Sequence, residues 1–252
     1  MRIFLTLFFK ELRSLFFSPV AWVVLGLVMV INGFSFRAGI AALESAPRVG
    51  SIVTWTFNST WFWISYFFVF PLLTMRLFAE ERKLGTFETL FTAPVHTWQV
   101  VSAKYLAAVF FYCLLWLPSL GNFALFQWMT ANATELPRGV LYSTYLLLFF
   151  MGLFNLAAGC FASALTSNQI VAAALSFTIS VLHFLLGIFV LYLGRRVPEV
   201  FVDLVYYIAS VEHIRIFTAG LVDTRTLVYY GSLSLLFLVF THHVLEFRRW
   251  RL

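Results

Sequence analysis

Charged residues are scarce in this chain: they make up 11% of its 252 residues, whereas 62% are hydrophobic. Soluble globular domains are closer to about 45–50% apolar, and the mean hydropathy here is +0.90. Uncharged runs of about 17 residues or more recur, which is the length of helix that crosses a bilayer core. This scarcity excludes a soluble domain. The runs are continuously apolar, unlike the alternating strands of outer-membrane barrels, so we expect an all-α integral membrane protein.

Motifs for catalysis and nucleotide binding are also missing. None of the lysines, Lys10, Lys83 and Lys104, lies in a G-x-x-x-x-G-K-[ST] phosphate loop, and neither H-E-x-x-H nor G-x-S-x-G occurs. We therefore expect that the chain is not an enzyme and that it binds no cofactor or metal. If it moves a substrate against a gradient, the energy must come from another chain. The cysteines, Cys113 and Cys160, fall in apolar runs and are predicted to be buried.

Acidic residues are absent from all of the predicted spans, and His183 is the one candidate for an intramembrane proton relay. A hydrogen bond from His183 to a neighbouring helix is the favoured interpretation. The lack of acidic residues argues against transport coupled to an ion. A sodium site made of carbonyls and hydroxyls remains an alternative, because it needs no acid. The net charge of +6 comes from Lys and Arg at the ends of apolar runs, which favours a lipid surface over nucleic acid.

The chain is predicted to form a single transmembrane domain over residues 1–252. Residues 1–18 are expected to form an amphipathic interfacial helix, and residues 76–104 a loop. The segment 194–225 is too polar for a span and too apolar for a solvated loop. We expect it to hold short re-entrant helices. Six spans are predicted, at about 20–36, 58–75, 105–129, 140–165, 170–193 and 226–245.

The distribution of Lys and Arg predicts the orientation of these spans. Ten lie on the side of the termini and of the loop 76–104, against seven on the other side. The positive-inside rule therefore places both termini and this loop in the cytoplasm and 194–225 outside. In the interfacial helix, Glu11 falls on the apolar side and must either snorkel or bind a cation, and snorkelling is favoured.

The segment Met75–Val95 is unusually charged and carries its own helix signals. Gly85 loosens the chain, Thr86 can cap a helix, Glu88 lies in its first turn and Pro94 ends it. Apolar residues recur at spacings of three and four: Leu84, Phe87, Leu90 and Phe91. This pattern predicts a short amphipathic helix, which is either an ordinary interfacial loop or a docking element for a cytoplasmic partner.

The stretch "EERKLGTFETLFTAPV" resembles the signature loop E-E-x-x-x-G-T-x-E-x-L-x-x-x-P of type-2 ABC exporter permeases. The matching positions are Glu80, Glu81, Gly85, Thr86, Glu88, Leu90 and Pro94. "FKELRSLFFSPVAW" resembles the N-terminal interface helix of that family, and "ASALTSNQIVAA" resembles its turn between spans four and five. The C-terminal "FTAGLVDTRTLVYY" through "LEFRRWR" resembles the subfamily of gliding-motility-associated and copper-processing permeases.

The resemblance implies a half-transporter in the bacterial cytoplasmic (inner) membrane. Two permease subunits, identical or different, would form one pathway, and each would dock an ATP-binding subunit that holds ATP and Mg²⁺. The matching positions, together with Phe87, would form the coupling helix, and Pro71 and Pro118 would let spans two and three bend. A non-transporting assembly factor or anchor that uses the same docking helix is the alternative, followed by an ion-coupled carrier.

Overall fold

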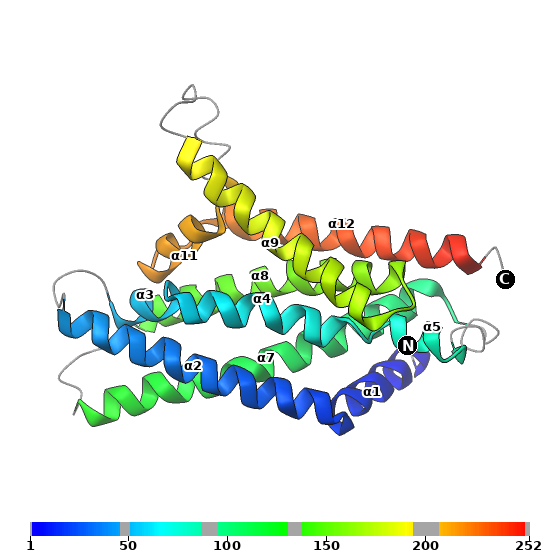
Figure 1. Ribbon diagram of the computed structural model, residues 1–252, viewed down its shortest axis with the longest axis horizontal. Coiled ribbons are helices and arrows are strands. Elements are labelled where there is room, and N and C mark those ends of the chain that lie inside the picture. Colours follow the sequence, from blue (N-terminus) through cyan, green and yellow to red (C-terminus); the bar gives the residue numbers. More distant parts are fainter. Residues whose placement is uncertain (1, 46–50, 87–94, 131–137, 194–206, 250–252) are drawn as a thin grey trace.

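The computed structural model describes residues 2–45, 51–86, 95–130, 138–193 and 207–249, and over these ranges it is all-helical. The N-terminus, the C-terminus and the short helix α5 lie at one end of the bundle (Figure 1), which we call the terminal end. The elements in chain order are α1 (Arg2–Phe17), α2 (Pro19–Ser45), α3 (Ile52–Phe57), α4 (Thr60–Thr74), α5 (Ala79–Lys83), α7 (Thr97–Met129), α8 (Arg138–Leu165), α9 (Gln169–Leu193), α11 (Ser210–Thr218) and α12 (Thr224–Arg249).

The predicted interfacial helix is α1, which meets α2 at a sharp bend (Figure 1). The bend falls at Ser18, because Pro19 lacks a backbone N–H and fits only the first turn of a new helix. The indole Nε1 of Trp22 donates to the carbonyl of Phe16 at 2.8 Å, which ties the two helices together. Helix α2 runs on to Ser45, past the predicted end of the first span at Phe36.

Five of the described helices are long and apolar enough to cross a membrane: α2, α7, α8, α9 and α12. The chain is therefore a multi-pass membrane protein. The second predicted span is α4, an apolar helix of only 15 residues. Its start is fixed by Ser59, whose Oγ accepts from the N–H of Phe62 at 3.2 Å. The six-span prediction thus holds for five long helices, and the second span stays a prediction.

The predicted re-entrant segment 194–225 contains α11, and residues 194–206 lie outside the described ranges. Helix α11 is held at its C-terminal end by two hydroxyls. Ser143 Oγ donates to the carbonyl of Phe217 at 2.6 Å, and Thr54 Oγ1 donates to that of Thr218 at 3.3 Å. Helix α11 packs against α3 and α8, and its re-entrant character stays a prediction.

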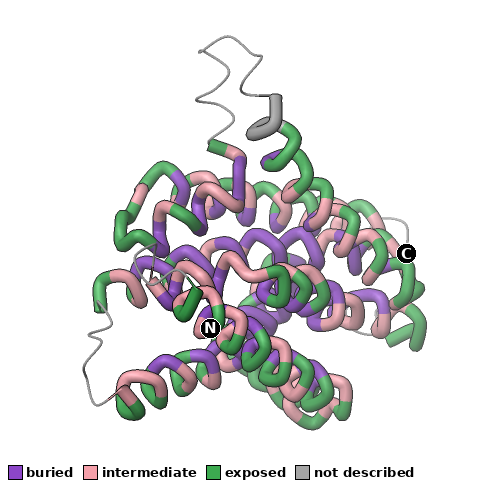
Figure 2. Tube along the Cα trace, turned by 60° about the vertical axis from the view of Figure 1, so that its left-hand side comes forward, coloured by how far each residue is buried: buried purple, intermediate pink, exposed green. Residues whose placement is uncertain are grey.

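Buried residues gather in the middle of the bundle (Figure 2). Among the long apolar helices, α7 and α8 are the most buried, and α4 packs against α8. Small residues allow the close approach of α4 to α8. A Cβ on Gly159 would lie 2.2 Å from Oγ1 of Thr74. The Thr74 side chain has no room to move aside, because it is fully buried and its hydroxyl donates to the carbonyl of Phe70 at 2.8 Å.

We therefore expect Gly159→Val to destabilise the protein by forcing α4 away from α8. Overpacking of this kind costs about 1–3 kcal/mol, or roughly 3–10 °C in unfolding temperature for a chain of this size. Thermal unfolding in detergent measures the effect. Gly33→Val is the matched control, because a Cβ at Gly33 would meet nothing within 4 Å, and equal unfolding temperatures for the two variants would contradict the packing argument.

Candidate functional site

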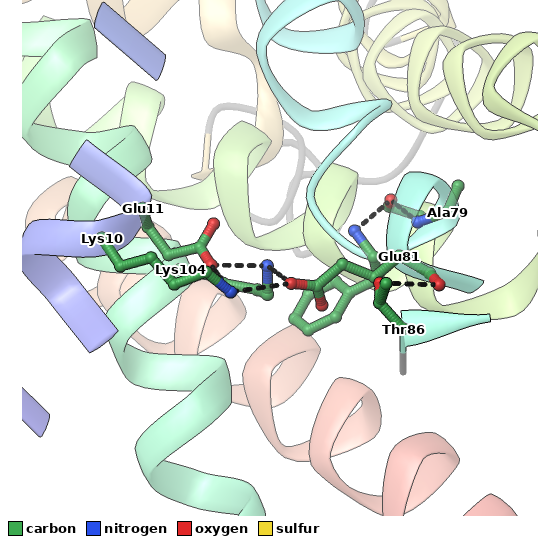
Figure 3. A network of polar contacts seen from close by, with 8 residues as sticks. Lys10, Glu11, Ala79, Glu81, Thr86 and Lys104 are labelled. Atoms are coloured by element: carbon green, nitrogen blue, oxygen red, sulfur yellow. Dashed lines mark hydrogen bonds and ion pairs between the residues drawn. The ribbon is translucent and has the colours of Figure 1, made fainter. Parts of the chain in front are cut away.

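Four charged side chains from three helices meet at the terminal end (Figure 3). Lys104 Nζ of α7 lies 3.0 Å from Oε1 of Glu11 on α1 and 3.0 Å from Oε1 of Glu81 on α5. Lys10 Nζ is more distant, at 3.9 Å from Glu11 and 3.7 Å from Glu81. We call Lys10, Glu11, Glu81 and Lys104 the polar cluster. The polar cluster joins α1, α5 and α7.

The favoured prediction that Glu11 snorkels is wrong, because Glu11 binds a cation instead. The reason is the true start of α7, which begins at Thr97 rather than near Tyr105. Lys104 therefore lies two turns inside a helix, and its side chain points into the bundle and not into a loop. Since α1 packs against α7, the acid on the apolar side of α1 faces this lysine.

Lys104 is only 3% exposed, and its ammonium also lies 5.6 Å from the centre of the Phe78 ring. A buried cation is tolerable only when anions pair with it closely. Here two carboxylates do so, and Lys10 brings the cluster to a balanced charge. Removing one member leaves a charge without its partner in a poorly solvated place. The contact between α1, α5 and α7 therefore depends on the complete set.

Helix α5 is fixed to the end of α8 by its backbone. The N–H groups of Phe78 and Ala79 donate to Ser163 Oγ at 3.0 and 3.1 Å. Arg82 Nη1 donates to the carbonyl of Ala164 at 3.2 Å. Burial lowers the pKa of the Arg82 guanidinium, and the nearby Arg248 adds to the effect, but an arginine remains charged at neutral pH. Helix α5 thus connects α8 with the polar cluster.

The chain turns directly after α5. Gly85 has φ +71°, in the left-handed region that favours glycine, and Thr86 Oγ1 donates to the carbonyl of Glu81 at 3.3 Å. Leu84 is 67% exposed at this turn. Residues 87–94 lie outside the described ranges, so the amphipathic helix over Leu84–Phe91 stays a prediction, as do the roles of the coupling residues there: Phe87, Glu88, Leu90 and Pro94.

The adjacent motif acids Glu80 and Glu81 both lie on α5 and both line a cavity of about 470 Å³, which the other members of the polar cluster also line. Of the two, Glu81 forms the ion pair with Lys104. This cavity lies between the α1–α2 bend, α4 and α5, and it also contains Arg76, whose Nη1 donates to Ser18 Oγ at 3.4 Å.

A second set of contacts at the terminal end joins α12 to α7 and to α8. Thr97 Oγ1 donates to the carboxylate of Glu246, and Trp98 stacks on His242 with ring centres 4.6 Å apart. Arg248 Nη2 donates to the carbonyl of Leu165 at 2.8 Å. No local sequence pattern predicts these contacts, because each of them joins residues on different helices.

The other candidate residues lie away from the polar cluster. Pro71 and Pro118 are inside α4 and α7, which continue through them, so the predicted bending there stays a prediction. His183 Nε2 forms a 2.9 Å hydrogen bond with the hydroxyl of Tyr229 on α12, which is the favoured expectation for this residue. Cys160 is buried as predicted, but the prediction for Cys113 is wrong, since it is exposed on α7.

Among the residues that the structure describes, His, Cys, Asp and Glu form no group of three or more that would hold a metal ion. In a comparison with protein-family models, residues 17–194 match the model described as ABC-2 family transporter protein. The match starts at the α1–α2 bend and includes the loop around α5. No curated protein matches the chain.

Proposed function

The chain belongs to the ABC-2 family of transporters, and on this premise we propose that it is the permease subunit of an ATP-driven exporter in the bacterial cytoplasmic membrane. ATP and Mg²⁺ are bound by a separate ATP-binding subunit, which docks on the loop 76–104. Both termini share the cytoplasmic side with this loop. The cargo is a lipid, another hydrophobic molecule or a polymer, and it crosses a pathway formed with a second permease subunit.

The observation that carries this proposal is the polar cluster. It ties α5 to α1 and α7 through Lys104, while Ser163 ties α5 to α8. A force applied to the loop after Gly85 is therefore passed to α1, α7 and α8 together, and it reaches α4 through the short connection before α5. The loop is mechanically joined to the bundle, as a coupling element must be.

The second permease subunit is supported by apolar side chains that this chain leaves exposed on α2 and α4. The larger ones are Trp22, Val23, Leu27, Met29, Val30, Phe34, Trp61, Ile64 and Phe68. Lipid and a second subunit both satisfy such a surface. The neighbouring genes would show whether that subunit is another copy of this chain or a different chain.

The test is ATP hydrolysis and transport in proteoliposomes that contain the chain and its ATP-binding subunit. We expect the two to co-purify and the hydrolysis to rise when a cargo extract is added. An assembly factor or anchor would co-purify with the ATPase and show no such rise. Gradient-dependent transport without any bound ATPase would instead favour an ion-coupled carrier and overturn the proposal.

A further inference from the structure

A groove of about 470 Å³ lies between α7 and α8, away from the polar cluster. Its floor is aromatic and buried, formed by Tyr112, Trp116 and Phe123. Exposed apolar side chains such as Leu117, Leu120 and Phe149 form its sides. The volume is within the range of small-molecule sites, and no step of the proposed ATP-driven mechanism uses it.

Of the two polar side chains of the floor, Tyr112 is paired, whereas the buried Nε1 of Trp116 has no hydrogen-bond partner among the described residues. Tyr112 Oη donates to the carbonyl of Leu148 at 2.9 Å, and the hydroxyls of Ser119 and Tyr145 are 2.6 Å apart. The floor therefore offers mainly ring faces, with the N–H of Trp116 as an open donor. An occupant of this part of the groove must be largely apolar, because most of its polar atoms would lose their hydration without gaining partners.

Among the described residues that line the groove, the one charged side chain lies at one end. Arg138, exposed at the start of α8, lines this end together with Gln127 near the end of α7. From Arg138 to Phe149 the groove follows α8 for about 17 Å at 1.5 Å per residue. One leaflet of a bilayer core is about 15 Å thick. The groove thus has one cationic end and the length of a single leaflet.

From this arrangement we propose that the groove binds a phospholipid of the surrounding bilayer, with one acyl chain along the aromatic floor and an anionic headgroup at Arg138. An arginine guanidinium pairs well with phosphate oxygens. The site is independent of the ATP-binding partner.

The test is native mass spectrometry of the delipidated full-length protein titrated with phosphatidylglycerol and, separately, with phosphatidylcholine. Leu120→Trp fills the groove, and Leu125→Trp is its control, an exposed leucine of α7 outside the lining. Arg138→Gln removes the cationic end, and Arg37→Gln is its control, an exposed arginine of α2 outside the lining.

We expect phosphatidylglycerol to bind more tightly than phosphatidylcholine at the first site. Leu120→Trp should weaken the binding of both lipids by about tenfold. Arg138→Gln should remove the preference for phosphatidylglycerol, because it removes the charge-assisted hydrogen bond to the anionic headgroup. Equal binding by Leu120→Trp and Leu125→Trp overturns the proposal, as does an unchanged lipid preference in Arg138→Gln.

A measurement on the wild-type protein keeps the proposal testable if a variant fails to fold. Phosphatidylglycerol with a diazirine in one acyl chain is photolysed in the complex, and the labelled peptides are mapped. We expect labels on 112–124 of α7 and 141–149 of α8 to exceed those on the exposed surface of α9. A uniform distribution over all lipid-facing helices would mean that the groove holds no particular lipid.

Discussion

Lys104→Met is expected to lower the stability of the protein by about 3–5 kcal/mol, the usual cost of breaking a buried ion pair by removing one partner. Methionine keeps the apolar length of the side chain, so the change isolates the charge. Glu11 and Glu81 would be left with Lys10 alone, whose Nζ is 3.9 and 3.7 Å away and whose side chain is 59% exposed. Thermal unfolding in detergent, with a shift of roughly 10 °C or more, measures the effect.

Lys83→Met is the matched control, because Lys83 lies on α5 and is exposed. It removes the same charge from the same end of the bundle without touching the polar cluster. Adding Glu11→Gln and Glu81→Gln to Lys104→Met should recover part of the lost stability, since no unpaired carboxylate then remains. If Lys104→Met and Lys83→Met unfold at the same temperature, the polar cluster does not hold α1, α5 and α7 together.

Gly85→Val is expected to uncouple ATP hydrolysis from movement of the spans while leaving the protein inserted and folded. The backbone of Gly85 has φ +71°, which a β-branched residue adopts only with strain of about 1–2 kcal/mol. A Cβ there would meet nothing within 4 Å, so the effect comes from the turn and not from a clash. The strained turn would redirect the segment that follows α5.

The readout is the change that ADP–vanadate causes in the labelling of a cysteine introduced by Leu221→Cys, an exposed position beyond α11. We expect this change in the otherwise wild-type complex and its loss in Gly85→Val. Gly85→Asn should retain it, because asparagine tolerates the left-handed region. Gly121→Val controls for bulk, since its Cβ also meets nothing within 4 Å and its φ is ordinary. A full response in Gly85→Val would contradict the coupling role of this turn.

The helices were predictable because their signals are local. Uncharged runs predicted the spans, and the amphipathic pattern of residues 1–18 predicted the interfacial helix α1. The ends of helices were less predictable. Polar residues can continue a helix beyond the hydrocarbon, so α2 and α7 extend past the apolar runs that revealed them. A 15-residue helix such as α4 is also hard to separate from a full span by hydropathy alone.

The polar cluster was not predictable in the same way. Glu11, Glu81 and Lys104 are far apart in the chain, and no periodicity connects residues on three different helices. The sequence did show that Glu11 was out of place on an apolar face, which was the available signal that a cation had to be near. The exposure of Cys113 was missed for a related reason. In a helix that is apolar all round, composition does not distinguish the packed side from the lipid side.

The most direct test of the account is a photo-crosslink from Leu84, placed by substituting benzoylphenylalanine, to the ATP-binding subunit in native membranes. Leu84 is 67% exposed beside α5. Leu221 is 65% exposed and lies away from the terminal end, so it serves as the matched control. The account predicts a covalent adduct with the ATP-binding subunit from Leu84 and none from Leu221. An adduct from Leu221, or none from Leu84 while the subunits still co-purify, would contradict it.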